Sequence, residues 1–351
     1  AWGFNTEVGP GAVPPPLESL EAMLPQDHRW PIEEIWDFHC GGGEFKKMTD
    51  FTRALDARFG KSTGIADFAW KSQAQAYETI RAMYEGFRAN KFEATGEIQW
   101  MLNNAWPSMI WHLYDWYLTP TGGFFAARKA NEPLHIQYSY DDASVVVVNN
   151  EYKPFHSLKA TATVYNLDMT RKYTNTQQVD VTDDGVTRAF NIPAVEGLTP
   201  TYFLKLELHD PAGKLVSSNF YWLSTQADVI DWAKTISYVT PETQYADLKG
   251  LNDLPKVKLT ASATLHEAAG AKITTVTLRN HSNALAFLVR VRLLDPAGKD
   301  VLPVLWDDNF VSLLPGETRE IIAHVEPHQL TGNPTVRIEG WNVSEESVAV
   351  K

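Results

Sequence analysis

Aromatic and amide side chains gather in one stretch of the chain, residues 96–116. A short extended run leads to Trp100, and Asn103 and Trp106 follow at close spacing. Indole rings pack on the C–H faces of a pyranose, while amides and carboxylates bond the sugar hydroxyls. Composition alone favours a buried core for aromatics at this spacing, so a sugar site needs support from elsewhere in the chain.

A carboxylate near the start of the chain is the second candidate. Residues 2–9 read as a short buried strand, and Gly9-Pro10-Gly11 ends it just after Glu7. Glu7 therefore lies at the C-terminal end of a strand, where barrels and open α/β sheets place their chemistry. On this local evidence, a single glutamate is more often solvated or paired in a structural role.

Composition and charge narrow the class of protein. The 351 residues are 44% hydrophobic and 21% charged, with a net charge of −12. We expect no nucleic-acid partner, because no basic stripe is present to meet phosphates. A cationic substrate would suit this charge. No apolar run is long enough to span a bilayer, so no membrane partner is expected. The opening Ala1-Trp2-Gly3 is typical of a piece of a longer chain.

We expect neither a metal nor a cofactor. Cys40 is the only cysteine, which excludes an intrachain disulfide and a cysteine-based metal site. His39, His112 and His135 lack the spacing of metal ligands.

The elements before residue 135 predict the last part of a (β/α)8 TIM barrel. A helix is expected over 17–24, a long one over 65–90 from its apolar periodicity, and a third over 124–131. Strands are expected near Glu7 and over 98–102, with residues 25–64 irregular. A whole barrel takes about 250 residues, so residues 1–135 would supply only its C-terminal part.

Short β segments separated by turns follow residue 135 and predict two immunoglobulin-like sandwiches. A repeat supports two successive domains of the same kind, because Asp210-Pro211-Ala212-Gly213 recurs as Asp295-Pro296-Ala297-Gly298, an offset of 85 (295 minus 210). In both copies a strand enters the turn, where proline presets φ and glycine allows positive φ. The expected domains are a sandwich over 136–238, a linker over 239–255 and a second sandwich over 256–351.

Three stretches together resemble glycoside hydrolase family 2, and within it the exo-β-D-glucosaminidases most of all. They are GFNTEVGPG (3–11), GEIQWMLNNAWPSMIW (96–111) and AARKANEPLHIQYSYDDASVVVVNN (126–150). TPTYFLKLEL (199–208), NFYWLST (219–225) and YADLKGL (245–251) extend the resemblance through the first sandwich and the linker.

The resemblance implies roles for four residues. Glu7 matches the catalytic nucleophile of a retaining mechanism, which needs two carboxyl groups roughly 5 Å apart. Trp100 matches the aromatic floor for the terminal sugar, and Asn103 and Trp106 would lie within reach of its hydroxyls. The family's general acid lies on an earlier strand, and no residue here matches it. An N-terminal part, as a missing segment or a partner chain, is therefore expected to supply the acid.

The implied activity is removal of β-linked glucosamine from the non-reducing ends of chitosan oligosaccharides. Two alternatives stay open: a β-mannosidase of the same family, exo or endo, and a non-catalytic carbohydrate-binding module that uses the tryptophans and sandwiches. The family and its polymer substrate imply a secreted or periplasmic enzyme.

Overall fold

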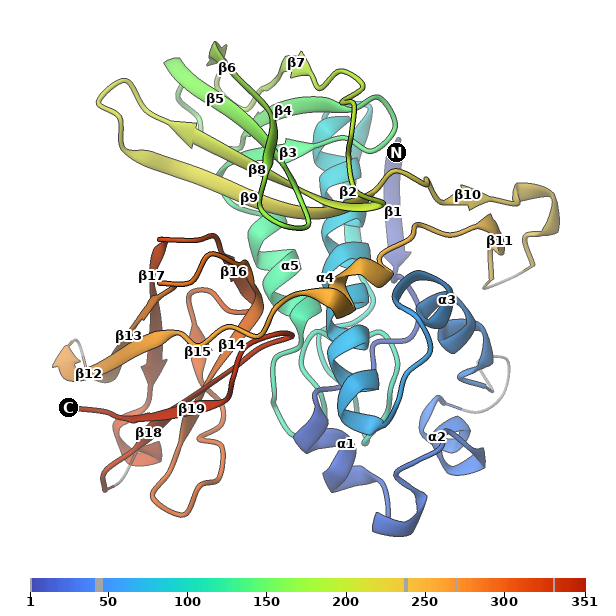
Figure 1. Ribbon diagram of the computed structural model, residues 1–351, viewed down its shortest axis with the longest axis vertical. Helices are drawn as coiled ribbons and strands as arrows, with labels where there is room; N and C mark the ends of the chain where they lie inside the picture. The colour runs from blue at the N-terminus through green and yellow to red at the C-terminus, as the bar shows by residue number, and fades with distance from the viewer. Residues whose placement is uncertain (1, 42–46, 237–238, 269, 331) are drawn as a thin grey trace.

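The computed structural model describes residues 2–41, 47–236, 239–268, 270–330 and 332–351 (Figure 1). A helical N-terminal region with one pair of strands is followed by two β sandwiches. Figure 1 shows the long helix α4 between the first sandwich, at the top, and the helices α1, α2 and α3 at the bottom. No described helix has the length and apolar character needed to cross a membrane.

The N-terminal region is built around two parallel strands, β1 (Gly3–Val8) and β2 (Ala94–Gln99). The helices α4 (Ile65–Ala89) and α5 (Gly122–Ala130) pack against each other, and α4 also contacts β2. Parallel strands joined through a helix are the unit from which a (β/α)8 barrel is made, so this region is the predicted end of a barrel. The predicted strand over 98–102 was displaced, since β2 ends before Trp100.

Residues 25–64 are more regular than predicted. After α1 (Leu17–Met23) come a 3₁₀ turn, η1 (Gln26–His28), and two helices, α2 (Glu34–His39) and α3 (Thr49–Phe59). The prediction of an irregular segment was therefore wrong. Phe51, Leu55 and Phe59 recur every four residues and pack into the core from one face of α3, which is the pattern that could have revealed this helix.

The first sandwich has two antiparallel sheets, with strand orders β3-β4-β7 and β6-β5-β8-β9. Alternate residues of facing strands, such as Val145, Val147, Leu204 and Leu206, fill a core of its own. The strands are β3 (Leu134–Tyr138), β4 (Ser144–Asn149), β5 (Phe155–Asn166), β6 (Arg171–Val181), β7 (Val186–Asn191), β8 (Thr201–His209) and β9 (Leu215–Ser224).

The second sandwich pairs the sheets β12-β13-β17-β15 and β16-β14-β18-β19. Its strands are β12 (Thr260–Ala268), β13 (Ala271–Arg279), β14 (Ala286–Leu294), β15 (Leu305–Trp306), β16 (Val311–Leu313), β17 (Thr318–Val325), β18 (Thr335–Glu339) and β19 (Glu346–Ala349), with the 3₁₀ turn η5 (Pro327–Gln329) after β17.

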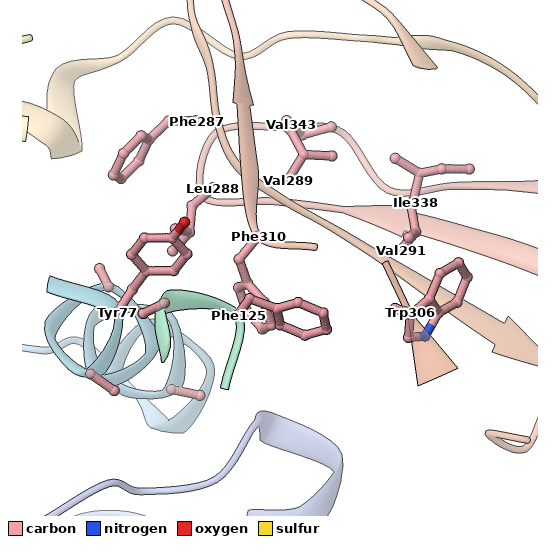
Figure 2. Packing of buried hydrophobic residues seen from close by; sticks show 14 of the residues in the cluster. Tyr77, Phe125, Phe287, Leu288, Val289, Val291, Trp306, Phe310, Ile338 and Val343 are labelled. Carbon is pink, nitrogen blue, oxygen red and sulfur yellow. The ribbon is translucent and has the colours of Figure 1, made fainter. Parts of the chain in front are cut away.

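The second sandwich shares one continuous core with the helices. Figure 2 shows Tyr77 of α4 and Phe125 of α5 beside Phe310 and Leu288 of the sandwich. The rings of Phe125 and Phe310 lie 5.9 Å apart. Because the two regions bury apolar side chains in the same core, the sandwich is fixed against the barrel end and is not a separate domain joined only by a linker.

The two copies of the Asp-Pro-Ala-Gly repeat form equivalent turns. Gly213 and Gly298 have φ of 85° and 79°, and the amide of each donates a 2.9 Å hydrogen bond to the carbonyl oxygen of Asp210 or Asp295. Glycine adopts positive φ without a steric cost, so the repeated glycine has the predicted conformational role.

The segment between the sandwiches is packed rather than extended. It contains β10 (Val229–Ile230), η3 (Trp232–Lys234), β11 (Glu242–Gln244) and η4 (Lys249–Asp253), and β10 pairs with β11. Leu248, Leu251 and Leu254 are buried in the shared core. The boundaries proposed for the linker and for the domains stay predictions.

Candidate functional site

The strands β1 and β2 end side by side at one edge of their sheet. Their register pairs Asn5 with Glu97 and Val8 with Gln99, so β1 carries one extra residue between these two pairs. Such a bulge bends the strand and re-aims the side chains within it. Thr6 and Glu7 are the residues inside the bulge, and both are exposed. The exposed Glu7 carboxylate therefore lies at the C-terminal end of β1, as predicted.

One face of this two-stranded sheet is apolar and open. Phe4 and Gly96 share it, because a Cβ added to Gly96 would lie 2.7 Å from the Phe4 ring. Ile98 and Trp100 follow two and four residues after Gly96 and are exposed. Large exposed apolar side chains on one strand face indicate a surface that binds another protein segment or a ligand.

Trp100 stands directly after β2, next to the end of β1. Its amide donates a 2.8 Å hydrogen bond to the carbonyl oxygen of Val8, and the Trp100–Met101 peptide bond is cis. The indole is 45% exposed. The amide of Met101 then donates to the carbonyl oxygen of Trp111 at 2.8 Å. Trp100 is thus held by its backbone, with its side chain free to meet a ligand.

Asn103 is exposed, but its amide nitrogen has structural partners. The Nδ2 atom donates to the carbonyl oxygens of Tyr114 at 3.2 Å and Asp115 at 2.7 Å. These bonds close the loop that follows Trp100 and leave Oδ1 as the atom of this side chain suited to accept from a sugar hydroxyl.

The buried neighbour Asn104 braces the same loop. Its Nδ2 lies 2.5 Å from Nδ1 of His112 and 3.2 Å from the carbonyl oxygen of Ile110. Burial lowers the pKa of His112 to about 3, so the ring is neutral at physiological pH.

Trp106 is fixed by two aromatic residues at the end of α2. Its ring stacks on His39 at 5.7 Å with an interplanar angle of 19°, and it meets Phe38 edge-on at 5.4 Å. His39 Nδ1 lies 2.8 Å from the carbonyl oxygen of Pro107. The sequence reasoning did not foresee that α2 holds this tryptophan, because the contact joins residues that are about 70 positions apart.

Two other carboxylates of this region do not belong to the open face. Asp115 is buried, and its Oδ1 accepts hydrogen bonds of 2.9 Å from the amides of Tyr117 and Thr119, which holds a turn. Burial raises its pKa to about 6. Glu97 lies on the opposite face of β2 from Trp100, beside Tyr84 of α4, and burial raises its pKa to about 8.

Within the described part of the chain, no group of three or more His, Cys, Asp or Glu side chains is arranged to hold a metal ion.

Known proteins resemble this chain over almost its whole length. A model for the exo-β-D-glucosaminidase Ig-fold domain matches residues 237–343, and one for the mannosidase Ig/CBM-like domain matches residues 141–226. The exo-β-D-glucosaminidase of Amycolatopsis orientalis is 42% identical over 99% of this chain, and that of Streptomyces avermitilis is also 42% identical over 99%. Close homologues of this chain are therefore exo-β-D-glucosaminidases of glycoside hydrolase family 2.

Solved structures agree with this assignment. The exo-chitosanase CsxA of A. orientalis superimposes with a TM-score of 0.94 at 41% identity, covering 99% of this chain and 43% of that one. A β-D-mannosidase from Dictyoglomus thermophilum, at 18% identity and a TM-score of 0.71, shares the fold. The chain spans 35% and 40% of the length of the two bacterial relatives.

Proposed function

We propose that this chain supplies the nucleophile half of the active site of a retaining exo-acting β-glucosaminidase that acts on chitosan oligosaccharides. One observation carries the proposal: the exposed Glu7 carboxylate lies in the bulge that ends β1, beside the strand that ends at Trp100. The relatives that match 99% of the chain are named exo-β-D-glucosaminidases, and one structure of CsxA is a complex with PNP-β-D-glucosamine.

In this proposal Glu7 attacks the anomeric carbon and forms a covalent glycosyl-enzyme. A second carboxyl group, roughly 5 Å away, first protonates the leaving oxygen and then activates water. Trp100 forms the floor for the terminal sugar, and Asn103 Oδ1 and Trp106 contact its hydroxyls or ring. The net charge of −12 favours the approach of a polycation.

The second carboxyl group would come from an N-terminal part that closes a (β/α)8 TIM barrel over the open face. Phe4 and Ile98 are 58% and 53% exposed there, and burial of such side chains would stabilise the closed barrel. The greater length of the relatives supports this proposal. Because the substrate is a polymer, we place the reaction outside the cytoplasm, as a secreted or periplasmic one.

Rates on paired substrates test the proposal. The chain, joined to or mixed with its N-terminal part, is assayed on p-nitrophenyl β-glucosaminide and p-nitrophenyl β-mannoside in parallel. The glucosaminide should react faster. Preference for the mannoside would instead support the β-mannosidase alternative, and full activity of the chain alone would contradict the division of the site.

The Glu7→Gln variant tests the role of the carboxylate. Turnover should fall by at least about a thousandfold, while the sugar still binds, because the amide keeps the size of the side chain but is a poor nucleophile. Glu93→Gln, an exposed change just before β2, is the matched control and should keep full turnover. If the wild-type assembled protein binds sugar but does not hydrolyse it, the protein is better described as a non-catalytic carbohydrate-binding module.

A further inference from the structure

A pocket of about 300 Å³ lies beside α2 and is partly open to solvent. It is lined by the segment after η1, by α2 and α3, and by the start of α4. The side chains that give it chemical character are Trp30, Glu33, Asp37, Asp56, Lys61 and Ser62. Its volume is at the lower end of the range for small-molecule sites, which is the size expected for a single ring.

The indole in this pocket is held rigidly. Trp30 is partly buried and meets Trp36 edge-on, with ring centres 6.4 Å apart and an interplanar angle of 79°. On another side it packs against Phe68 at 6.3 Å. An aromatic ring fixed by two others, with part of its surface open, can stack on a sugar or attract a cation at little entropic cost.

The charge of the pocket is negative, because three carboxylates face one lysine. Glu33 Oε1 lies 2.5 Å from Nδ1 of the exposed His28, and Asp37 Oδ1 accepts a 2.8 Å hydrogen bond from the amide of Met48. Each of these two carboxylates has a second oxygen outside those bonds, and Asp56 adds a third carboxylate to the lining. Carboxylates around an aromatic floor favour a cationic ligand.

A buried hydroxyl gives an independent indication of a ligand. Ser62 lines the pocket at 8% exposure, and its Oγ has no hydrogen-bond partner in the part of the chain that the structure describes. A buried hydroxyl usually has a partner. Because this Oγ is closed to solvent in the structure, a group in the pocket would reach it only after the Ser62 side chain turns toward the pocket.

We infer that this pocket is an accessory binding site for a glucosamine unit. The ammonium group would meet the carboxylates, the ring would stack on Trp30, and a ring hydroxyl would bond Ser62 after that side chain turns toward the ligand. Asp37 lines the pocket, and the next two residues of α2, Phe38 and His39, contact Trp106 of the candidate site. The two sites therefore share the helix α2. The choice of glucosamine as the ligand rests on the proposed function, whereas the pocket itself does not depend on Glu7 being the nucleophile.

Calorimetric titration of the chain joined to its N-terminal part, and of three variants of that protein, tests the inference. The ligands are free glucosamine, the glucosamine tetramer and the neutral N-acetylglucosamine tetramer. Asp56→Asn removes one charge from the pocket. Asp50→Asn is the matched control on the same helix, where its side chain pairs only with exposed Arg53 among the contacts described. Trp100→Ala removes binding at the candidate site.

Asp56→Asn should weaken binding of the glucosamine tetramer roughly tenfold, because a charge-assisted contact is lost. Asp50→Asn should leave affinity unchanged, Trp100→Ala should keep the binding that depends on Asp56, and the neutral tetramer should bind more weakly. If Asp56→Asn also weakens the binding of free glucosamine, the pocket recognises a single sugar unit. If it weakens only the binding of the tetramer, the pocket recognises a longer stretch of the oligosaccharide.

Equal affinity of wild type and Asp56→Asn would overturn the inference, as would the absence of binding at millimolar tetramer. Binding that only Trp100→Ala abolishes would also overturn it, while leaving the proposed catalytic site intact. Loss of binding in Asp56→Asn but not in Trp100→Ala would support the accessory site whatever the outcome of the activity assays.

Discussion

The amide of Trp100 donates a 2.8 Å hydrogen bond to the carbonyl oxygen of Val8. Val8 follows Glu7, so this bond ties the position of the exposed indole to the strand end that carries the carboxylate. An aromatic floor and a nucleophile must keep a fixed separation for a sugar to lie on one and meet the other. The following predictions examine this arrangement and the contacts that support it.

Gly9→Ala should disturb the junction between Glu7 and Trp100. A Cβ at Gly9 would lie 2.5 Å from the carbonyl oxygen of Trp100, and a backbone atom cannot swing aside as a side chain can. We expect a loss of about 1–3 kcal/mol in the free energy of unfolding, measured by urea denaturation. Gly86→Ala in α4 is the control, since its Cβ would meet no atom within 4 Å and helix propensity should make it neutral or slightly stabilising. Equal effects of both changes would contradict the proposed close contact.

Glu97→Gln should change how stability depends on pH. Burial raises the pKa of Glu97 from 4.5 to about 8 in the folded chain. Below pH 4.5 both states are protonated. As pH rises to 8 the unfolded chain loses the proton while the folded chain resists, so this residue lowers stability progressively over that range.

The neutral glutamine removes that penalty. Melting temperatures of Glu97→Gln and wild type should agree near pH 4.5 and diverge toward pH 8, with the variant more stable. Glu93→Gln, with an exposed side chain, should follow the wild-type curve. Parallel curves for Glu97→Gln and wild type would show that the carboxylate is not buried in this way.

Glu85→Gln should loosen the first sandwich from α4. The Glu85 carboxylate is 2% exposed, accepts hydrogen bonds from the Tyr221 hydroxyl at 2.9 Å and from Asn219 Nδ2 at 2.7 Å, and lies 2.9 Å from His135 Nε2. Replacing one member of a buried charged network costs about 3 kcal/mol. Urea denaturation should show this loss, with Glu93→Gln near wild type. If the two variants were equally stable, the network would not hold the sandwich.

Arg58→Met should free the hairpin formed by β10 and β11. Arg58 is buried, and its Nη2 lies 3.1 Å from Asp228 Oδ1 and 2.9 Å from Glu242 Oε1. Asp228 directly precedes β10, and Glu242 is the first residue of β11. Its loss leaves the carboxylates without their cation, at a cost of about 3 kcal/mol. Hydrogen exchange at the β10 and β11 amides should become faster, while Arg279→Met, at an exposed position, should leave it unchanged. Unaltered exchange in Arg58→Met would show that other contacts hold the hairpin.

The local patterns predicted the larger elements well. The apolar period of residues 65–90 matches α4 to within one residue, and the repeated Asp-Pro-Ala-Gly marks two equivalent turns. The prediction of β2 was displaced, because Ile98 and Trp100 have a high strand propensity, whereas Ala94 and Gly96 of the actual strand are residue types depleted in strands. Propensity therefore pointed to the loop after the strand.

The roles of Glu7, Trp100, Asn103 and Trp106 stay predictions, and the structure adds what surrounds them. Asn103 uses its amide nitrogen to close a loop, and Trp106 stands against the end of α2. Neither contact follows any periodicity: the Asn103 bonds join two positions of one long loop, and the Trp106 contact joins that loop to a helix about 70 residues earlier.

The periodicity and turn residues of the sequence by themselves predicted the end of a barrel followed by two sandwiches. The family and the catalytic role expected for Glu7 came from the resemblance of whole stretches of the sequence to glycoside hydrolase family 2. Only the tertiary structure decided the bulge at Glu7, because a bulge exists only relative to the register of a partner strand, and β2 comes some 90 residues later. The pocket around Trp30 was likewise decided by folding, since its walls come from helices whose packing no local pattern specifies.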